Sequence, residues 1–503
     1  MGTRGFLNGL NATQRGGLSG LRSLPGVQRV SLRVAGLRHR PDAWIAILGF
    51  AAFCTVVLFR AAALLEPDDY AYRASIVALG HGHIILSNAQ YLVLNHQLGG
   101  SGGSGILQWH HLASGKWISE KNPGYPFLAV VFYVVGLLRV APLFYGALAA
   151  VGLFLGARAW LGRWAGTYAV LIYLFSGAAL TFAWRSTMPS FSDASLIAAA
   201  VGGLLWVVLR VDVNVRRRLG VGLACFVALE AAVFIRYTDA VVIVVALLAV
   251  AIVRRRVQLP WSAVIAWTSS VALFGLGVLA FDSWAYGSAT STGYSTGEIS
   301  FSPSSFYPNL RGMPAHLTRS MPVWLLAAVA VAWIVVRLIR SRHHGDSDSR
   351  QLVRRDAVVA AALTAGWLSI WLLYLNYTWT VSQLGGHGPG PGGGAITVHL
   401  IRFYLPALGM IALLGAWVLS RIPRSAAWLA VAALVAASIF SFQSMSANSG
   451  GGSPGAIPGA GSTGNQRPQP PGPGFPGAGP PGGSQPTAVP SIPHAGATST
   501  PRG

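Results

Sequence analysis

Long apolar runs recur along most of the chain, and short polar segments separate them. A helix that crosses a bilayer needs about 20 predominantly apolar residues, and most of these runs have about that length. The pattern predicts an all-α, polytopic membrane helical bundle of about eleven transmembrane helices. The predicted spans are residues 44–65, 142–161, 163–183, 193–211, 219–236, 239–253, 261–282, 321–340, 357–376, 401–420 and 426–443.

One further apolar run, Pro123 to Val140, decides the topology. If it does not cross, the arginine-rich loops share one side with the basic N-terminus, as the positive-inside rule requires. If it crosses, the triple-arginine loops move to the opposite side. We therefore predict that it lies at the outer interface or re-enters from outside, although its length also suits a true span. The basic loops contain Arg216–Arg218, Arg254–Arg256, Arg337–Arg355, Arg421 and Arg424.

Composition supports a membrane protein. Of the 503 residues, 53% are hydrophobic and only 10% are charged, whereas soluble domains average about 25% charged residues. The net charge of +22 would suit a nucleic-acid partner. Because the basic residues cluster in short loops between apolar runs, we attribute the charge to membrane topology and predict no nucleic-acid binding.

The topology divides the chain into three segments. Residues 1–43 form a basic cytoplasmic segment, residues 44–443 form the membrane domain, and residues 444–503 form a Pro/Gly-rich tail on the non-cytoplasmic side. The tail has too few bulky apolar residues for a core and is predicted to be disordered. In the first outer loop, Tyr72 to Leu98 predict an amphipathic stretch that lies on the membrane surface, and Gly99 to Gly105 predict a flexible link.

The placement of the acidic residues is informative because there are only 14 of them. Acidic groups at or within a membrane are costly and indicate a functional site. An alternative for Asp68, Asp69 and Asp193 is a helix N-terminus, where carboxylates cap free N–H groups. Glu230 lies within an apolar run. The acidic residues at predicted outer helix ends are Glu66, Asp68, Asp69, Glu120, Asp193, Asp239 and Asp282.

Basic residues on the predicted outer side are few. Lys116 and Lys121 are the two lysines of the chain, and both fall in the first outer loop. A lysine ammonium suits a phosphate, although a solvated lysine or a contact with a lipid headgroup is an equal alternative. Arg236 and Arg402 lie at outer helix ends. Histidines 81, 83, 96, 110 and 111 share the first outer loop, but their spacing matches no zinc template.

These motifs together resemble the GT-C superfamily of integral-membrane glycosyltransferases, in particular the branch of protein mannosyltransferases and the aminoarabinose lipid A transferase. The chain departs from that pattern at Asp69, where a glutamate is common, and at Asn122, which interrupts a proline pair. The segments that carry the resemblance are Pro67-Asp68-Asp69 with Tyr72, Glu120 to Pro126, Met188-Pro189 with Asp193, Arg236-Tyr237-Thr238, Gly287 to Tyr294, and Arg402 to Pro406.

The resemblance implies an inverting transfer of a hexosyl or pentosyl group from a polyprenyl-phosphate donor to a lipid, glycan or protein acceptor. The reaction would take place at the outer face of the plasma membrane, with interfacial helices between the first two spans and with no metal or cofactor. The implied roles are Asp68 as the base, Asp69 and Tyr72 as orienting groups, Lys121 and Arg402 as phosphate ligands with Arg236 a weaker candidate, and Asp193 and Tyr125 as further substrate-binding residues.

Two other classes of function remain open at this point. A secondary transporter or lipid flippase would use Glu230 and Asp239 as ion sites and would contain broken helices. A non-catalytic scaffold of envelope assembly would use the C-terminal tail as a binding arm. The enzyme is favoured because most acidic residues lie at outer helix ends and not near the middle of the membrane.

Overall fold

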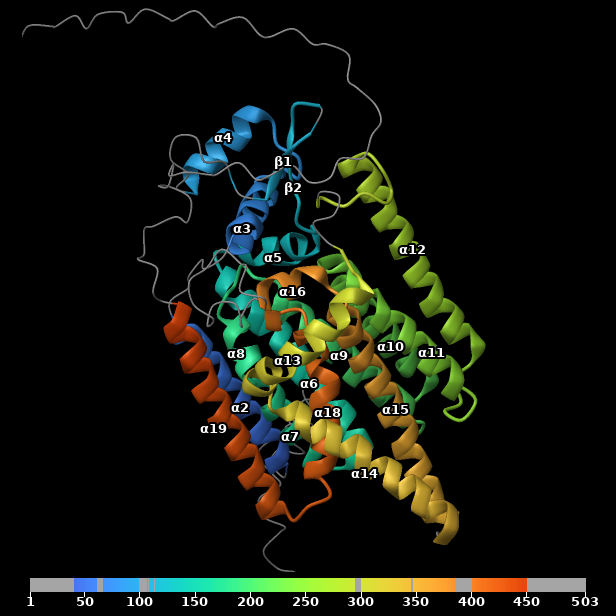
Figure 1. Cartoon of the computed structure of the whole chain (residues 1–503). Coiled ribbons are helices and arrows are strands. Elements are labelled where there is room, and N and C mark those ends of the chain that lie inside the picture. The colour runs from blue at the N-terminus through green and yellow to red at the C-terminus, as the bar shows by residue number, and fades with distance from the viewer. Residues whose placement is uncertain are drawn as a thin grey trace, which may run out of the picture. The chain divides into compact units, whose positions relative to one another are not determined.

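A computed structural model shows a bundle of α-helices (Figure 1). A smaller part lies at one end of the bundle, and we call it the outer segment. It contains two helices in residues 67–97 and a β-hairpin in residues 109–119. The structure describes residues 40–60, 67–98, 106, 108–112, 114–294, 300–344, 347–384 and 400–449, without the side chains of 342–344, 347–349, 382–384 and 444–449. Most of the predicted N-terminal segment, the glycine-rich link 99–105 and the tail from residue 450 lie outside the described residues.

Helices account for nearly all of the regular structure, which confirms the predicted all-α class. The α-helices are α2 (Pro41–Phe59), α3 (Pro67–Gly80), α4 (Asn88–Gln97), α5 (Gly124–Val134), α6 (Ala141–Leu161), α7 (Ala165–Leu174), α8 (Gly177–Ala183), α9 (Ser190–Leu209), α10 (Val215–Ile235), α11 (Ala240–Val253), α12 (Trp261–Tyr286), α13 (Phe306–Ser320), α14 (Val323–His344), α15 (Ser347–Leu375), α16 (Thr378–Leu384), α18 (Leu408–Leu419) and α19 (Arg424–Ser449). The 3₁₀ turns are η2 (Leu138–Val140), η3 (Tyr237–Asp239), η4 (Pro303–Ser305) and η5 (Leu405–Ala407). One antiparallel pair, β1 (Trp109–His111) and β2 (Trp117–Ser119), places Trp109 opposite Ser119.

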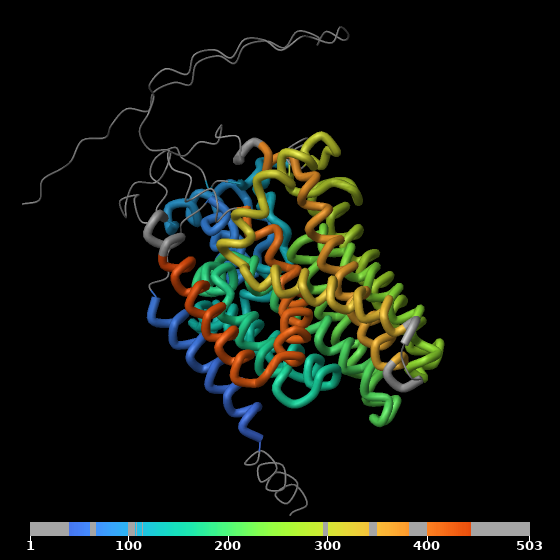
Figure 2. Tube along the Cα trace, turned by 60° about the horizontal axis from the view of Figure 1, so that its bottom comes forward, coloured from blue at the N-terminus to red at the C-terminus, as the bar shows by residue number. Residues whose placement is uncertain are grey.

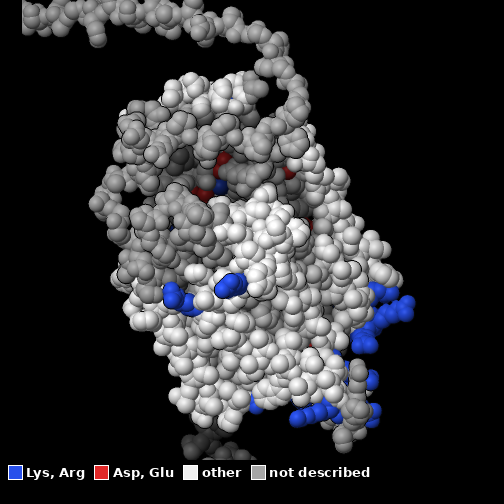
Figure 3. Space-filling view, viewed as in Figure 1, with Lys and Arg blue, Asp and Glu red and all other residues white. Residues whose placement is uncertain are grey.

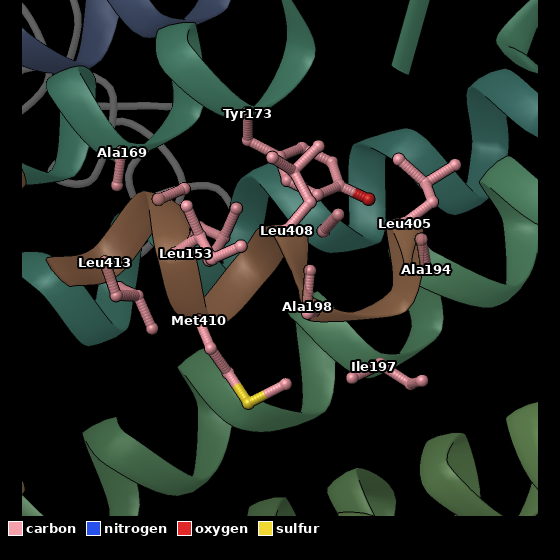
Figure 4. Packing of buried hydrophobic residues seen from close by; sticks show 14 of the residues in the cluster. Leu153, Ala169, Tyr173, Ala194, Ile197, Ala198, Leu405, Leu408, Met410 and Leu413 are labelled. Atoms are coloured by element: carbon pink, nitrogen blue, oxygen red, sulfur yellow. The ribbon is translucent and has the colours of Figure 1, made fainter. Parts of the chain in front are cut away.

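Among the described residues, eight helices are long and apolar enough to cross a membrane, and the pair α7 and α8, bent by 59°, makes a possible ninth. By length and composition alone, these helices account for nine of the eleven predicted spans. The remaining two predicted spans, 239–253 and 401–420, correspond to the shorter apolar helices α11 and α18. Every residue of α18 is buried, because this helix packs at the centre of the bundle and contacts other helices along its whole length (Figure 4).

The apolar run 123–140 forms no continuous helix. Helix α5 has 11 residues and is therefore about 16 Å long, about half the thickness of the hydrocarbon core. Gly136, with φ of 74°, turns the chain before η2 leads into α6. A helix of this length supports the prediction that the run does not span.

The predicted basic loops meet at one end of the bundle, which we call the arginine end. There Asp42 at the start of α2 binds two cations from the α6–α7 region, and Asp356 of α15 accepts hydrogen bonds from the ends of α6 and α18. Arg218 of α10 donates to one backbone carbonyl in the last turn of α9 and to one after α11. The partners are Arg158 and Arg163 for Asp42, Trp160, Trp417 and Arg421 for Asp356, and Val207 and Val257 for Arg218. That this end faces the cytoplasm remains a prediction.

Small residues allow the central helices to approach closely. A Cβ atom on Gly152 of α6 would lie 2.4 Å from the carbonyl oxygen of Ala199 in α9, and one on Gly156 would lie 2.4 Å from that of Gly202. Small residues at such contacts are typical of helix packing in membranes. The first and last long helices, α2 and α19, both pack against α7 and α8 and run side by side (Figure 2).

The outer segment consists of α3, α4 and the β1–β2 hairpin. The predicted amphipathic stretch, Tyr72 to Leu98, contains two helices, because α3 ends at Gly80 and Ser87 begins α4 with a capping box. Tyr91 of α4 stacks on Trp117 of β2 with ring centroids 3.9 Å apart. This contact joins α4 to the hairpin.

Candidate functional site

A cavity of about 650 Å³ lies between the outer segment and the ends of the helices, at the end of the bundle opposite the arginine end. We call this the site end. Acidic and basic atoms are visible inside a hollow there, whereas many basic side chains cluster at the lower right (Figure 3). Charged and polar residues of the lining are Asp68, Gln108, Lys121, Asn122, Ser190, Arg236, Thr238, Thr292 and Arg402, and aromatic residues are Tyr72, Tyr237, Tyr294, Phe301, Tyr374, Tyr377, Trp379 and Phe403.

Asp68 holds two cations in the cavity. Pro67 begins α3, which places Asp68 in the first turn of the helix, as the capping alternative also required. Its Oδ1 atom lies 3.2 Å from Lys121 Nζ, and its Oδ2 atom accepts a hydrogen bond from Arg402. Burial alone would raise the pKa of Asp68, but the positive charges of Arg402 and Lys121 outweigh it and hold this pKa well below its usual range. Asp68 is therefore ionised and forms ion pairs with both Lys121 and Arg402.

Lys121 is surrounded by acceptors. Besides Asp68, its ammonium lies 3.3 Å from Glu120 Oε1 and donates to the hydroxyl of Tyr294 at 3.3 Å. Burial raises the pKa of Tyr294, with Asp68 adding to the effect, so the hydroxyl keeps its proton. Glu120 in turn lies 3.1 Å from His110 of β1. These contacts fix Lys121 between the hairpin, the loop after α12 and α3.

Arg236 is the third cation of the cavity. It donates to the backbone oxygen of Arg402 at 3.0 Å and lies 3.6 Å from Asp193. Burial would lower the pKa of Arg236, but Tyr374 and the carboxyl groups of Asp193 and Asp239 more than offset this and raise it. These contacts hold the Arg236 guanidinium at the end of α10 that borders the cavity.

A close backbone contact connects the Lys121 and Arg236 segments. A Cβ atom on Gly124 would lie 2.3 Å from the carbonyl carbon of Phe234, so no side chain fits between these two chain segments. The side-chain amide of Asn122 donates to the Ile235 oxygen at 3.2 Å. Helix α5 is thereby pressed directly against the end of α10.

Five of the eight predicted site residues line the cavity, namely Asp68, Tyr72, Lys121, Arg236 and Arg402. The other three are buried beside it. Asp69 bonds to Arg185 and, at 3.1 Å, to Thr187 Oγ1. Tyr125 donates to the backbone oxygen of Ser186 and packs edge-on against Tyr72. Asp193 is completely buried in the first turn of α9. These three side chains are therefore not part of the cavity lining.

The cavity also involves residues that were not among the eight predicted site residues. Gln108 hydrogen-bonds to Asp68 and has φ of 63°, a left-handed conformation that is uncommon for residues other than glycine and often marks a functional site. Tyr294 comes from a segment without conspicuous charge. The same holds for Tyr374 of α15, Trp379 of α16 and Tyr377 between them, which we call the aromatic wall. Only the positive charge of Arg402 drew attention to the adjacent Phe403.

A second, apolar cavity of about 470 Å³ lies among α9, α11 and α15, and we call it the apolar groove. Its lining includes Val242 of α11 and Gly366 of α15, which lie about one and two turns from cavity residues Thr238 and Tyr374 of the same chain segments. It continues to Ile252 and Val358, nearer the arginine end. The cavity with charged residues and the apolar groove therefore lie one after the other along the same chain segments.

Solved structures superpose on part of this chain. ArnT from Cupriavidus metallidurans bound to undecaprenyl phosphate superposes with a TM-score of 0.46 and 14% identity over 77% of this chain and 61% of that protein. The archaeal oligosaccharyltransferase AglB from Archaeoglobus fulgidus, in complex with an inhibitory peptide and a dolichol-phosphate, gives 0.46 and 9% over 80% of this chain and 56% of its own. Both superpositions are partial, with TM-scores below 0.5.

The extent of the similarity is limited. This chain spans about three fifths of the length of these proteins, and identities of 9 to 14% assign no activity. No protein-family model matches the chain, and no curated protein matches it. Within the described ranges, no group of three His, Cys, Asp or Glu side chains is arranged to hold a metal ion, and the metal requirement remains untested.

Proposed function

We propose that this protein is a glycosyltransferase that moves a sugar from a polyprenyl-phosphate donor to an envelope acceptor at the non-cytoplasmic face of the plasma membrane. One observation carries the proposal: Lys121, Arg236 and Arg402 line a single cavity that is followed by an apolar groove. A phosphate attached to a long hydrocarbon chain has the chemistry to match both. The sugar and the acceptor would occupy the remaining, aromatic part of the cavity.

The three cations would bind the donor phosphate and stabilise it as it leaves. When the bond between the anomeric carbon and the phosphate oxygen breaks, the electron pair passes to that oxygen. Fixed positive charges near the oxygen stabilise this developing charge in the transition state. Arg402 and Lys121 are both mostly buried, so water screens their charges little.

Asp68 would accept the proton of the acceptor hydroxyl as this oxygen bonds to the anomeric carbon. A carboxylate paired with two cations is a weak base, so the donor must first change its surroundings. A phosphate that draws Lys121 and Arg402 toward itself removes the stabilising charges from Asp68 and restores its basicity. In this scheme donor binding prepares the base, and the acceptor is activated only when donor is present.

The apolar groove would hold the first part of the polyprenyl chain. A large side chain inside it tests this directly, since Ala249→Trp fills the groove on α11, whereas Ala272→Trp places the same side chain on an exposed position of α12. We expect Ala249→Trp to weaken binding of a long polyprenyl phosphate by at least tenfold and to leave a phosphate with a two-isoprene chain unaffected. Ala272→Trp should change neither.

Binding of labelled polyprenyl phosphates to the purified full-length protein in nanodiscs provides the measurement. Equal loss for long and short chains would show that Ala249→Trp damages the fold. Absence of binding of either phosphate to the unmodified protein would overturn the proposed function itself. Transfer of a radiolabelled sugar from a polyprenyl-phosphate donor in detergent, with extracted envelope lipids and glycans as acceptors, then tests the reaction.

The transporter alternative gains one feature from the structure, because α7 and α8 form a broken helix. The break is packed closed: Ser176 donates to the Ser320 oxygen at 3.4 Å, and a Cβ atom on Gly177 would lie 3.1 Å from the same oxygen. Glu230 accepts a hydrogen bond from Ser270 of α12. Activity in detergent, where no compartments exist, separates an enzyme from a transporter.

A further inference from the structure

Two buried carboxyl groups lie behind Arg236, outside the cavity lining. Asp193 is in the first turn of α9, and Asp239 ends η3; they are 0% and 2% exposed. The two groups lie within hydrogen-bonding range of each other. None of their four oxygen atoms receives a hydrogen bond from another described residue. Such buried oxygens are costly unless a proton or a donor satisfies them.

The surroundings offer one positive charge for two carboxyl groups. Arg236 is 3.6 Å from Asp193 and also lies near Asp239. Two tyrosines also face the pair, and both have other partners: Tyr173 bonds to Ser195 at 3.0 Å, and Tyr374 bonds to Thr238 at 2.6 Å. Two ionised carboxylates beside one guanidinium would leave a net negative charge in a buried region.

Like charges in contact cannot both persist in a medium of low dielectric constant, and such pairs retain one proton between them. A pair with one proton has a charge of −1, which balances the charge of Arg236. We propose that Asp193 and Asp239 share a single proton and act together as the counter-ion that positions Arg236 at the cavity. Only the role of Arg236 toward phosphate rests on the proposed function.

The shared proton makes the two aspartates interchangeable. In Asp193→Asn or Asp239→Asn, the amide N–H donates to the remaining carboxylate as the shared proton does, and the charge stays at −1. Each single variant should therefore keep a melting temperature close to that of the unmodified protein. The double Asn variant leaves Arg236 buried without a counter-ion, so its loss of thermal stability should far exceed the sum of the single losses.

Infrared spectroscopy of the full-length protein in nanodiscs at neutral pH tests the proton itself. We expect a C=O stretching band of a protonated carboxyl group that shifts in deuterated water and that disappears in each single Asn variant. Asp282→Asn and Glu230→Gln serve as controls, because these residues are buried acids with partners Tyr237 and Ser270. The band should survive in both controls.

Several results would overturn the proposal: no such band in the unmodified protein, a band that persists in either pair variant, or a band that disappears only in a control. Additive losses of melting temperature would also contradict it. A single Asn variant that fails to fold would show that the two aspartates are not interchangeable, which also contradicts the proposal. Neither measurement involves sugar transfer, so a failure here is distinct from a failure of the proposed function.

Discussion

Lys121 Nζ lies 3.2 Å from Asp68 Oδ1, although the two residues come from different segments of the first outer loop. The second oxygen of Asp68 accepts a hydrogen bond from Arg402. A donor phosphate would need the same two cations. Asp68 and the phosphate therefore compete for them in the proposed function, and this competition separates the effects of mutations on binding from those on turnover.

Asp68→Asn should separate the two effects most clearly. The change keeps the shape of the side chain and removes its charge, so Lys121 and Arg402 become more available to phosphate. We expect polyprenyl phosphate to bind as tightly as before or several-fold more tightly, while turnover falls by roughly 10²–10⁴-fold, the usual size of general-base catalysis. Binding assays and single-turnover transfer measure the two quantities. Normal turnover by folded Asp68→Asn would rule out Asp68 as the base.

The two lysines provide a matched pair of variants. Lys121→Ala removes a charged contact to the phosphate worth about 1.5–3 kcal/mol, which corresponds to a roughly 10- to 150-fold weaker Kd. Lys116 is exposed on the turn of the hairpin, and Lys116→Ala should leave Kd within about twofold. Titration with polyprenyl phosphate checks both. Equal Kd values for the two variants would exclude Lys121 from the phosphate site.

The pH dependence should differ between kcat and kcat/KM. Although burial opposes it, the positive charges of Arg402 and Lys121 lower the pKa of Asp68 in the free protein. Its contribution to stability is therefore complete above the unfolded pKa of about 3.9 and is lost only as pH falls through the lower folded value. Bound phosphate withdraws the cations and raises this pKa.

It follows that kcat, which reports the donor complex, should fall on the acid side, while kcat/KM, which reports the free enzyme, should show no acid limb from Asp68. Initial rates between about pH 5 and 8 provide the test. An acid limb in kcat/KM that moves in Asp68→Glu would contradict the proposed exchange of cations.

The orientation in the membrane can be tested by cysteine labelling in a background without Cys54 and Cys225. Ser101→Cys lies in the predicted outer loop, outside the described residues, and Ser347→Cys lies at the start of α15, near the arginine end. A membrane-impermeant maleimide added to intact cells should label the first and not the second. Labelling at Ser347 would reverse the predicted orientation and place the site end in the cytoplasm.

The sequence predicted much of the charged lining of the cavity because charge is rare in this chain. Asp68, Lys121, Arg236 and Arg402 stood out against apolar surroundings, and all four line the cavity. Asp69 was included because the resemblance contains a pair of acidic residues at this position. Successive residues on a helix point about 100° apart, so the two carboxylates cannot face the same cavity, and Asp69 pairs with Arg185 instead.

Other features depend on tertiary contacts that hydropathy does not encode. An apolar run has the same appearance whether its helix is straight or broken, so residues 163–183 were predicted as one span and not as α7 and α8. The 12-residue helix α18 can be short because it is surrounded by other helices. Gln108 and the aromatic wall reach the cavity from segments far apart in the chain, and no local pattern links them.

The contact of Gly124 with Phe234 has a consequence for selectivity. Lys121 precedes this contact by three residues and Arg236 follows it by two, so the spacing of the two cations is set by touching backbones and not by flexible side chains alone. In the proposed function, the fixed distance between Lys121 and Arg236 would favour anions of matching size. A methyl group at position 124 would increase this distance without removing any charge. It would therefore change which anion is bound more than how strongly anions are attracted.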